Sequence, residues 1–454
     1  MKIIIVGAGK VGCTLAQSLA SEKHDVILVD KSQEVLDNAL TKIDCMTVRG
    51  NGAIQSVLIE AQVETADYLI ACTNSDEINI LTCLISRKSS NCRTIARMRN
   101  PEYAKQIEYI MKELDITITI NPELATAREI ARILRYPKSI ASLSFFKGRL
   151  NTLMIEIPEK SKIVGMNLAE ANKTLNCSVL ICVIERNDEV IIPNGNSIIE
   201  KNDKILFVAD HQNVISFFKE IGYEYKQPSS YLIVGAGRIT HYLIDILLAS
   251  NTNYSIKVIE KDRDNCINIA DKYPSISVVK ADATEKNVLM QEGMNDVDAF
   301  ITLTGLDEEN IILALLANNS NTKSIAKVNH LNFFDAIKDL DIGSIVNPES
   351  IATNIILSYI RAAENGGNSD INSLYRLFND RVEALGFKIK NDSNVTNVKI
   401  KDLKIKPNVV IAGIYRKGNI IRPNGFDELK VGDSVVIITK DNKFKNITDI
   451  VENN

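Results

Sequence analysis

The stretch "IIIVGAGKVG" at residues 3–12 returns as "YLIVGAGRIT" at residues 231–240. In both copies an apolar run leads directly into a glycine-rich turn, a pattern typical of a buried parallel strand followed by a helix. Gly7 permits a tight turn, Gly9 lets backbone N–H groups approach a pyrophosphate, and Gly12 lets the helix pack closely on the strand. The candidate binding residues of this first turn are Gly7, Ala8, Gly9, Lys10, Val11 and Gly12.

Asp30 ends the next apolar run, "DVILVD" at 25–30. A carboxylate at the end of the second strand can accept hydrogen bonds from both hydroxyls of a ribose. The same carboxylate repels a 2′-phosphate. The first turn therefore favours NAD or an adenosine nucleotide over NADP.

The second turn departs from the first at Thr240, which stands in the place of Gly12. A β-branched side chain at this contact costs about 1–3 kcal/mol unless the helix moves away, and a displaced helix withdraws its N–H groups from the phosphates. Glu260 is one methylene longer than Asp30 and can still reach a ribose. We expect a second site with altered ligand preference. Its candidate residues on this basis are Gly235, Gly237, Arg238 and Glu260.

The repeat extends along the whole chain of 454 residues. "TNSDEIN" at 73–79 matches "TGLDEEN" at 304–310, and "INPELATAREI" at 120–130 matches "VNPESIATNII" at 346–356. A near-constant offset of this kind indicates a duplicated unit. The chain consists of two halves of about 225 residues, each with a long first part and a short second part.

The long part of each half alternates apolar runs with helical patterns, which predicts a doubly wound parallel sheet. The short part holds hairpin patterns, with turns at Asn187-Asp188 and Lys417-Gly418, and predicts a small β-rich α+β module. The predicted fold class is α/β: two tandem Rossmann-like domains, each followed by a small module. The expected domain ranges are 1–138, 140–225, 229–365 and 370–454.

Three polar residues follow predicted strands near the crevice where the strand order reverses. Thr73 and Asn74 follow the fourth strand, and Arg97 ends the fifth. We expect all three to lie near the nucleotide. Structural alternatives stay open: Ser75 and its neighbours can cap a helix, and Arg97 can be ion-paired or solvated.

Bulk properties exclude several classes of protein. The net charge of −4 gives no support for nucleic-acid binding, and no apolar run is long enough to span a bilayer. The eight cysteines have no C-x-x-C spacing, and the four histidines are far apart, so we expect core thiols in cytoplasm and no metal site.

The residues favour a ligand sensor over an enzyme. A dehydrogenase needs groups that polarise a carbonyl and exchange a proton, and no Y-x-x-x-K motif occurs in the chain. Neither glycine turn contains a histidine. We therefore expect no catalytic residues. An NAD-dependent oxidoreductase and a sensor of cyclic dinucleotides remain alternatives.

The chain resembles the peripheral subunits of Trk-type potassium uptake systems, which carry two tandem regulator-of-potassium-conductance (RCK) units. The resemblance rests on "IIIVGAGKVG", "VD" at 29–30, "ADYLIACTNSDEIN" at 66–79, "IARMRNPEY" at 95–103, and the "IPNG" and "RPNG" turns. It covers essentially the whole sequence. It implies binding of NAD(H) and of ATP or ADP, and assembly into a homo-oligomeric ring, with a tetramer favoured. It also implies docking on an integral-membrane potassium-translocating subunit of the Trk or Ktr type, at the inner face of the cell membrane.

The resemblance also assigns site residues. The family pattern implies that Gly7 to Val11, Asp30, Thr73, Asn74 and Arg97 contact a first nucleotide. It implies that Gly235 to Ile239, Glu260 and Thr304 contact a second. Gly305 stands where the first half has Asn74, and with Thr240 it is the second departure from the pattern.

Overall fold

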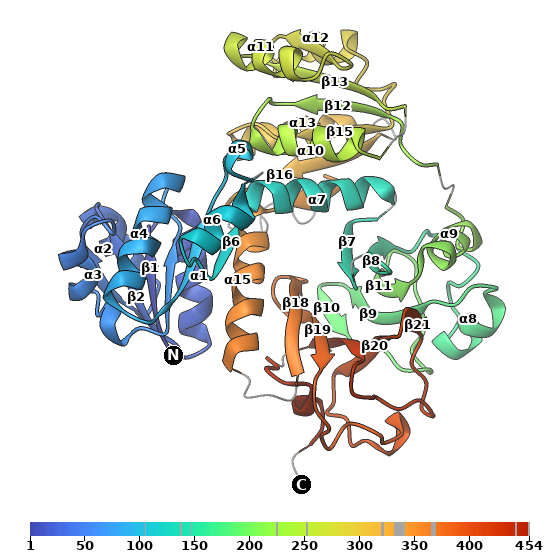
Figure 1. Ribbon diagram of the computed structural model, residues 1–454. Helices are drawn as coiled ribbons and strands as arrows, with labels where there is room; N and C mark the ends of the chain where they lie inside the picture. Colours follow the sequence, from blue (N-terminus) through green and yellow to red (C-terminus); the bar gives the residue numbers. More distant parts are fainter. Residues whose placement is uncertain are drawn as a thin grey trace.

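Two parallel sheets and two antiparallel sheets make up the protein (Figure 1). The computed structural model describes all residues except 105, 137–138, 147, 224–225, 251–252, 319–321, 331–339, 341, 365–368, 441–442 and 453–454. The predicted α/β class, with a small sheet after each Rossmann-like sheet, is confirmed. The expected domain ends at 138, 225, 365 and 454 lie outside the described residues, and the four ranges stay predictions.

The first parallel sheet has the order β3-β2-β1-β4-β5-β6. Its order reverses between β1 and β4, so the carboxyl ends of these strands flank the first glycine turn. The elements are β1 (Lys2–Val6), α1 (Lys10–Ser21), β2 (Asp25–Asp30), α2 (Gln33–Leu40), β3 (Met46–Arg49), α3 (Gln55–Glu60), η1 (Val63–Thr65), β4 (Tyr68–Ala71), α4 (Asp76–Ser89), β5 (Arg93–Arg97), α5 (Pro101–Ala104), α6 (Ile107–Glu113), β6 (Ile118–Ile120) and α7 (Pro122–Arg135).

The second parallel sheet repeats this order as β14-β13-β12-β15-β16-β17. All its described pairings are parallel, as the continuous apolar runs predict. The elements are β12 (Ser230–Val234), α10 (Arg238–Leu248), β13 (Ser255–Glu260), α11 (Arg263–Lys272), β14 (Ser277–Lys280), α12 (Lys286–Gln291), β15 (Ala299–Thr302), α13 (Asp307–Asn318), β16 (Lys323–Lys327), β17 (Ser344–Val346) and α15 (Pro348–Glu364).

Each small module is a five-stranded antiparallel sheet. The predicted hairpin turns are present: Asn187 and Asp188 have φ of 51° and 60°, and Lys417 and Gly418 have 47° and 95°, as a two-residue hairpin loop requires. The elements are β7 (Ala141–Phe145), β8 (Leu150–Glu156), α8 (Leu168–Thr174), β9 (Leu180–Arg186), β10 (Glu189–Ile191), β11 (Lys204–Ala209), α9 (His211–Glu220), β18 (Ser369–Leu377), β19 (Val382–Ile389), η2 (Ile400–Asp402), β20 (Val409–Arg416), β21 (Asn419–Ile421), β22 (Ser434–Lys440) and η3 (Ile447–Ile450).

The last helix of each parallel-sheet unit packs on the other half of the chain. In Figure 1, α7 lies beside α10 of the second half, and α15 lies beside the first sheet. Apolar side chains cover both contacts: Ile130 and Ile133 of α7 share a buried cluster with α10, and Ile356 and Ile360 of α15 share one with α1. Neither half buries its glycine-turn helix by itself.

A buried ion network reinforces the contact between α1 and α15. The Arg361 side chain is fully buried and donates to Glu22 at 2.6 Å and 2.9 Å and to Glu383 at 2.8 Å and 2.9 Å. Arg376 of β18 also donates to Glu22, at 2.7 Å. Burial alone raises the pKa of Glu22, but the hydrogen bond and charge of Arg361 outweigh it, so this pKa lies below its ordinary value. The network joins α1, α15 and the second small sheet.

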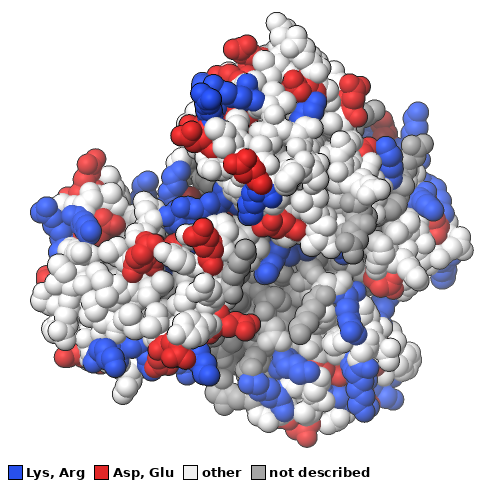
Figure 2. All heavy atoms as spheres, turned by 45° about the horizontal axis from the view of Figure 1, so that its top comes forward, with Lys and Arg blue, Asp and Glu red and all other residues white. Residues whose placement is uncertain are grey.

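No helix among the described residues combines the length and apolar character needed to cross a bilayer. Acidic and basic side chains are interspersed over the face that Figure 2 shows, without one large patch of either sign.

We predict that Arg361→Met lowers the free energy of unfolding by about 3–5 kcal/mol, because it leaves Glu22 and Glu383 buried with Arg376 as their shared cation. Adding Glu22→Gln should recover part of this loss. Thermal unfolding followed by circular dichroism measures both. The control is Arg263→Met, at an exposed position. Equal melting of the Arg361 and Arg263 variants would show that the network contributes nothing.

Candidate functional site

The two glycine turns have nearly the same backbone conformation. Gly9 caps α1 with φ −69° and ψ −173°, and Gly237 caps α10 with φ −76° and ψ −178°. A Cβ added at either glycine would meet no atom within 4 Å. Both positions therefore border open space, directly in front of the unpaired N–H groups of a helix N-terminus.

Two other glycines of the first turn are required by close packing. Gly7 has φ +105°, a conformation that favours glycine, and an added Cβ would lie 2.9 Å from the backbone nitrogen of Thr73. A Cβ at Gly12 would lie 1.9 Å from the carbonyl oxygen of Gly7. These contacts hold α1 tightly against the turn and the end of β4.

Thr240 fits in the second turn because its hydroxyl takes over a hydrogen bond. Thr240 Oγ1 is buried and donates to the Gly235 carbonyl at 2.6 Å. In the first turn the equivalent carbonyl, of Gly7, accepts from the Cys72 thiol at 3.4 Å. Burial raises the pKa of Cys72 to about 12, so the thiol keeps the proton that it donates. Because the spacing at Gly12 leaves no room for a Cβ, α10 must lie farther from its turn than α1 does.

Asp30 and Glu260 lie beneath their turns in equivalent positions. Asp30 accepts from the Ala8 N–H, and Glu260 accepts from the Ala236 N–H, each at 2.7 Å. The second oxygen of each carboxylate accepts the N–H two residues further along the chain. The additional methylene of Glu260 therefore leaves this role unchanged.

The Thr73 hydroxyl is used inside the protein. It donates to Asn79 Oδ1 at 2.7 Å, and the Thr73 N–H donates to the same oxygen at 2.8 Å. In the second half the Thr304 N–H donates to Asn310 Oδ1 at 2.9 Å. Ser75 caps α4 by accepting the Ile78 N–H, as the helix-cap alternative expects.

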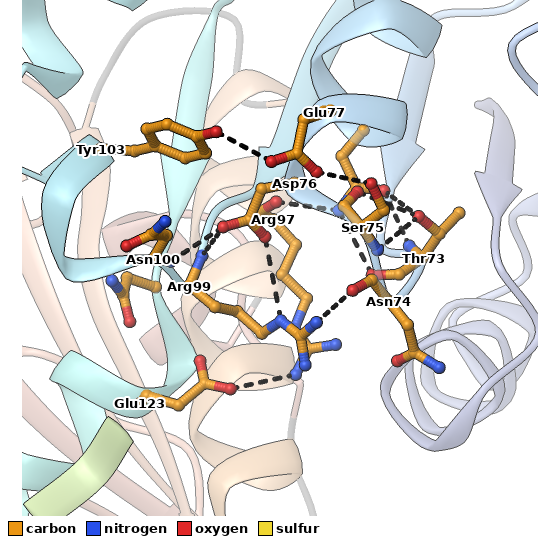
Figure 3. A network of polar contacts seen from close by, with 12 residues as sticks. Thr73, Asn74, Ser75, Asp76, Glu77, Arg97, Arg99, Asn100, Tyr103 and Glu123 are labelled. Atoms are coloured by element: carbon orange, nitrogen blue, oxygen red, sulfur yellow. Dashed lines mark hydrogen bonds and ion pairs between the residues drawn. The ribbon is translucent and has the colours of Figure 1, made fainter. Parts of the chain in front are cut away.

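A buried carboxylate orders the loop after β5. Asp76 accepts the N–H groups of Arg99 and Asn100, each at 2.8 Å, and the Arg99 guanidinium donates to the Asn74 carbonyl (Figure 3). These contacts fix Asn74 beside the end of β5. Asp307, which is also buried, accepts the Asn329 and His330 N–H groups in the second half.

Both glycine turns open into one cavity of about 490 Å³, which we name the inter-turn cavity. Its lining comes from both halves of the chain, because the crosswise packing of α7 and α15 turns the two sheets toward each other. The lining residues are Gly9, Lys10, Val11, Cys72, Asn74, Arg97, Pro122, Glu123, Gly237, Arg238, Ile239, Leu303, Lys327, Asn329, Pro348 and Glu349.

The charges around the inter-turn cavity repeat between the halves. Arg97 and Glu123 form an ion pair at 3.5 Å, and the equivalent positions hold Lys327 and Glu349. Burial lowers the pKa of Lys327 and raises the pKa of Glu349 to about 7, since both charged forms lose hydration. The positive charge of Lys10, from the other half, acts on both groups. Together with Arg238, the described lining holds four basic and two acidic side chains, so basic groups outnumber acidic groups around the cavity.

The structure brings only some of the predicted residues to this cavity. Those that line it are Gly9, Lys10, Val11, Asn74, Arg97, Gly237, Arg238 and Ile239. Those that lie beside the lining and support it are Gly7, Ala8, Gly12, Asp30, Thr73, Gly235, Ala236, Glu260 and Thr304. Their contacts with a nucleotide stay predictions.

Sequence reasoning missed the acidic and basic residues that complete the cavity. Glu123 and Glu349 lie in the repeated "NPE" segments at 121–123 and 347–349, and Lys327 aligns with Arg97. The repeat marked these positions, but only the packing of the halves shows that they face the glycine turns.

Comparison with known proteins agrees with the duplicated architecture. The sequence matches the TrkA-N domain at residues 3–122 and 231–348, and the TrkA-C domain at residues 153–222 and 385–451. The chain belongs to the TrkA family. The Trk system potassium uptake protein TrkA of Haemophilus influenzae is 30% identical over 450 residues, covering 98% of this chain and 96% of that protein. A TrkA homolog of Archaeoglobus fulgidus is 28% identical, covering 99% of this chain and all of its own length.

Solved structures share the fold of this TrkA-family chain. The GsuK RCK domain has a TM-score of 0.63 at 17% identity, covering 97% of this chain and 92% of that one. The GsuK channel bound to NAD has a TM-score of 0.62 at 17% identity, covering 97% of this chain and 77% of that one. The tandem arrangement of parallel and antiparallel sheets is thus an RCK-like fold.

We predict that Thr240→Val destabilises the protein by about 1–3 kcal/mol, because it leaves the buried Gly235 carbonyl without its donor while keeping the side-chain shape. Thr240→Ser keeps the hydroxyl and should lie closer to the unchanged protein. Thermal unfolding of the two variants side by side measures the difference. A valine variant as stable as the serine variant would contradict this role of the hydroxyl.

Proposed function

We propose that this chain is the nucleotide-binding regulatory subunit of a potassium uptake system and is not an enzyme. NAD(H) or an adenine nucleotide binds at each glycine turn. The chain assembles into a ring of four copies on the cytoplasmic face of an integral-membrane potassium-translocating subunit, and nucleotide occupancy gates that subunit. The observation that carries this proposal is the opening of both glycine turns into one basic cavity.

The turns fit the phosphates of a nucleotide. The open space at Gly9 and Gly237 leaves room for a pyrophosphate in front of each helix, where the helix dipole favours an anion. Lys10, Arg97, Arg238 and Lys327 add positive charge around the same space. Asp30 and Glu260 stand at the strand ends where a ribose binds in doubly wound folds.

The names of the similar proteins support two parts of the proposal: the role in potassium uptake and the class of nucleotide that binds. The matched relatives are named as potassium uptake proteins, and GsuK structures are described with NAD and with ADP. We infer the same ligand class for this chain, with ATP as the further adenine nucleotide that it binds.

The packing of α15 on α1 and of α7 on α10 connects each nucleotide site to a small sheet. Helix α1 begins at the inter-turn cavity and ends beside Glu22, which Arg361 links to the second small sheet. Helix α10 packs on α7, which leads into the first small sheet. A change at either turn therefore reaches the small module of the opposite half.

Thermodynamic linkage limits how far nucleotide binding can shift the ring between its open and closed arrangements. A nucleotide shifts the ring only by its differential affinity for the open and closed arrangements. A tenfold preference supplies about 1.4 kcal/mol for each site, and several identical sites in one ring make the response steep.

The binding prediction uses the open space at the two glycines. Gly9→Val and Gly237→Val each add a Cβ that meets no atom within 4 Å beyond the adjacent residues, so we expect them to obstruct a pyrophosphate with little disturbance of the packing. Each variant should lose one of two binding events for NADH or ADP in isothermal titration calorimetry, and the double variant should lose both. Gly195→Val is the matched control, since its added Cβ meets only Ala169, at 3.8 Å.

Gating is tested with the same variants in vesicles that contain the membrane potassium-translocating subunit. Potassium flux with the unchanged chain should respond to nucleotide, and flux with the double variant should not. Flux that ignores saturating nucleotide with the unchanged chain would overturn the proposal.

The affinity for ADP should depend on pH through Glu349. Because this carboxyl has a pKa of about 7, it is neutral below pH 7 and ionised above it, where it repels a phosphate. We expect the dissociation constant to rise between pH 6 and 8.5, with a limiting slope of about tenfold per pH unit for one linked proton. Glu349→Gln should flatten the profile, and His330→Asn controls for the nearby imidazole. Parallel profiles for the unchanged chain and Glu349→Gln would refute this.

A further inference from the structure

A second and larger cavity lies where the two halves meet, away from the glycine turns. Its volume is about 690 Å³, within the usual range of small-molecule sites. Its walls come mainly from α15, β18 and α7, with α1, β7 and the turn after β18 closing further sides. We name it the inter-helix cavity; it shares no described lining residue with the inter-turn cavity. Figure 1 shows α7 and α15 converging at the junction of the halves.

The two helices present unequal walls, although they occupy equivalent places in the repeat. On α7 the wall carries Arg128, Glu129 and Arg132. At the matching positions α15 carries Asn354, Ile355 and Ser358. One side of the cavity is therefore charged, and the other is uncharged.

The lining contains donors that the protein does not use. Thr353 is 2% exposed, and its hydroxyl has no hydrogen-bond partner among the described residues. A helical threonine usually bonds back along its own helix, as Thr126 does to the Pro122 carbonyl at 2.7 Å. Arg132 Nε is also buried without a partner in the described structure, and this guanidinium reaches Glu129 only at 3.8 Å. A buried donor without an acceptor is costly, so both groups point to an acceptor supplied by a ligand.

The charge balance defines the ligand. Arg376, the other cation of the wall, is already paired with Glu22 at 2.7 Å and Glu383 at 3.4 Å. Arg128 and Arg132 therefore remain for the ligand, while the two acidic lining residues, Glu129 and Asp380, oppose a highly charged anion. Aliphatic lining such as Leu143 and Ile351 suits an uncharged body.

We infer that the inter-helix cavity binds a small organic anion with a single negative charge and an apolar body. The anionic group accepts from Arg132 and Thr353, with Arg128 at the entrance, and the body lies against α15. Because the site lies between α7 and α15, its ligand contacts both halves of the chain.

The test uses 8-anilinonaphthalene-1-sulfonate, which joins one sulfonate to an apolar ring system. Its fluorescence is titrated with the full-length Gly9→Val/Gly237→Val variant, in which both glycine turns are obstructed. We expect saturable binding of one probe per chain. Arg132→Gln and Thr353→Val should each weaken binding by about tenfold, because each removes a hydrogen bond to a charged group. Arg135→Gln is the control, on the same helix at an exposed position outside the lining.

Two further arms distinguish the anion site from an apolar pocket and from a phosphate site. The uncharged analogue N-phenyl-1-naphthylamine should bind at least tenfold more weakly and respond to none of the substitutions. Inorganic pyrophosphate should not displace the sulfonate. Arg128→Gln, at an exposed position, provides a variant that leaves the packing intact if the buried variants fail to fold. Absence of saturable binding, equal binding of the uncharged analogue, or equal affinity of Arg128→Gln, Arg132→Gln and Arg135→Gln would overturn the inference.

Discussion

The burial of α7 against α10 and of α15 against α1 is the contact on which the rest of the structure depends. Each of these helices belongs by sequence to one half and covers the glycine-turn helix of the other. An amphipathic helix gains most of its stability from such burial, so neither half can dispense with its partner. The chain therefore behaves as one interlocked pair, although it arose from two similar units.

The interlocking explains why the two turns share a cavity. A glycine turn at the edge of a lone doubly wound sheet faces solvent. Here each turn faces the other, and charges from both halves surround the space between them. Glu349 lies in this shared space, and burial there raises the pKa of its carboxyl.

Local patterns in the sequence predicted the sheets, the hairpins and the two turns. Strand runs such as residues 2–6 and turn pairs such as Asn187-Asp188 depend on neighbouring residues, and the structure confirms both. The network around Arg361 could not be predicted, because its partner Glu22 lies 339 positions away and no local pattern connects them. An arginine in a helix ordinarily suggests a solvated face.

The Thr73 hydroxyl shows a second limit of such reasoning. Its position after a strand suggested a ligand contact, which stays a prediction; the hydrogen bond that it donates to Asn79 has no local signal in the sequence. Similarly, the glycine-turn pattern predicted an energetic cost for Thr240. In the structure its hydroxyl donates to the turn carbonyl, as the Cys72 thiol does in the first turn. Both outcomes depend on which polar atoms the fold leaves without partners.

The distance along the chain between α1 and α15 also sets the order in which the protein can mature. At a synthesis rate of roughly 5–20 residues per second, Arg361 leaves the ribosome about 20–70 s after Glu22. Throughout that interval α1 packs on its own sheet but lacks its contact with α15, and the Glu22 carboxylate lacks Arg361. The contact between the first sheet and α15 therefore forms only when translation is nearly complete.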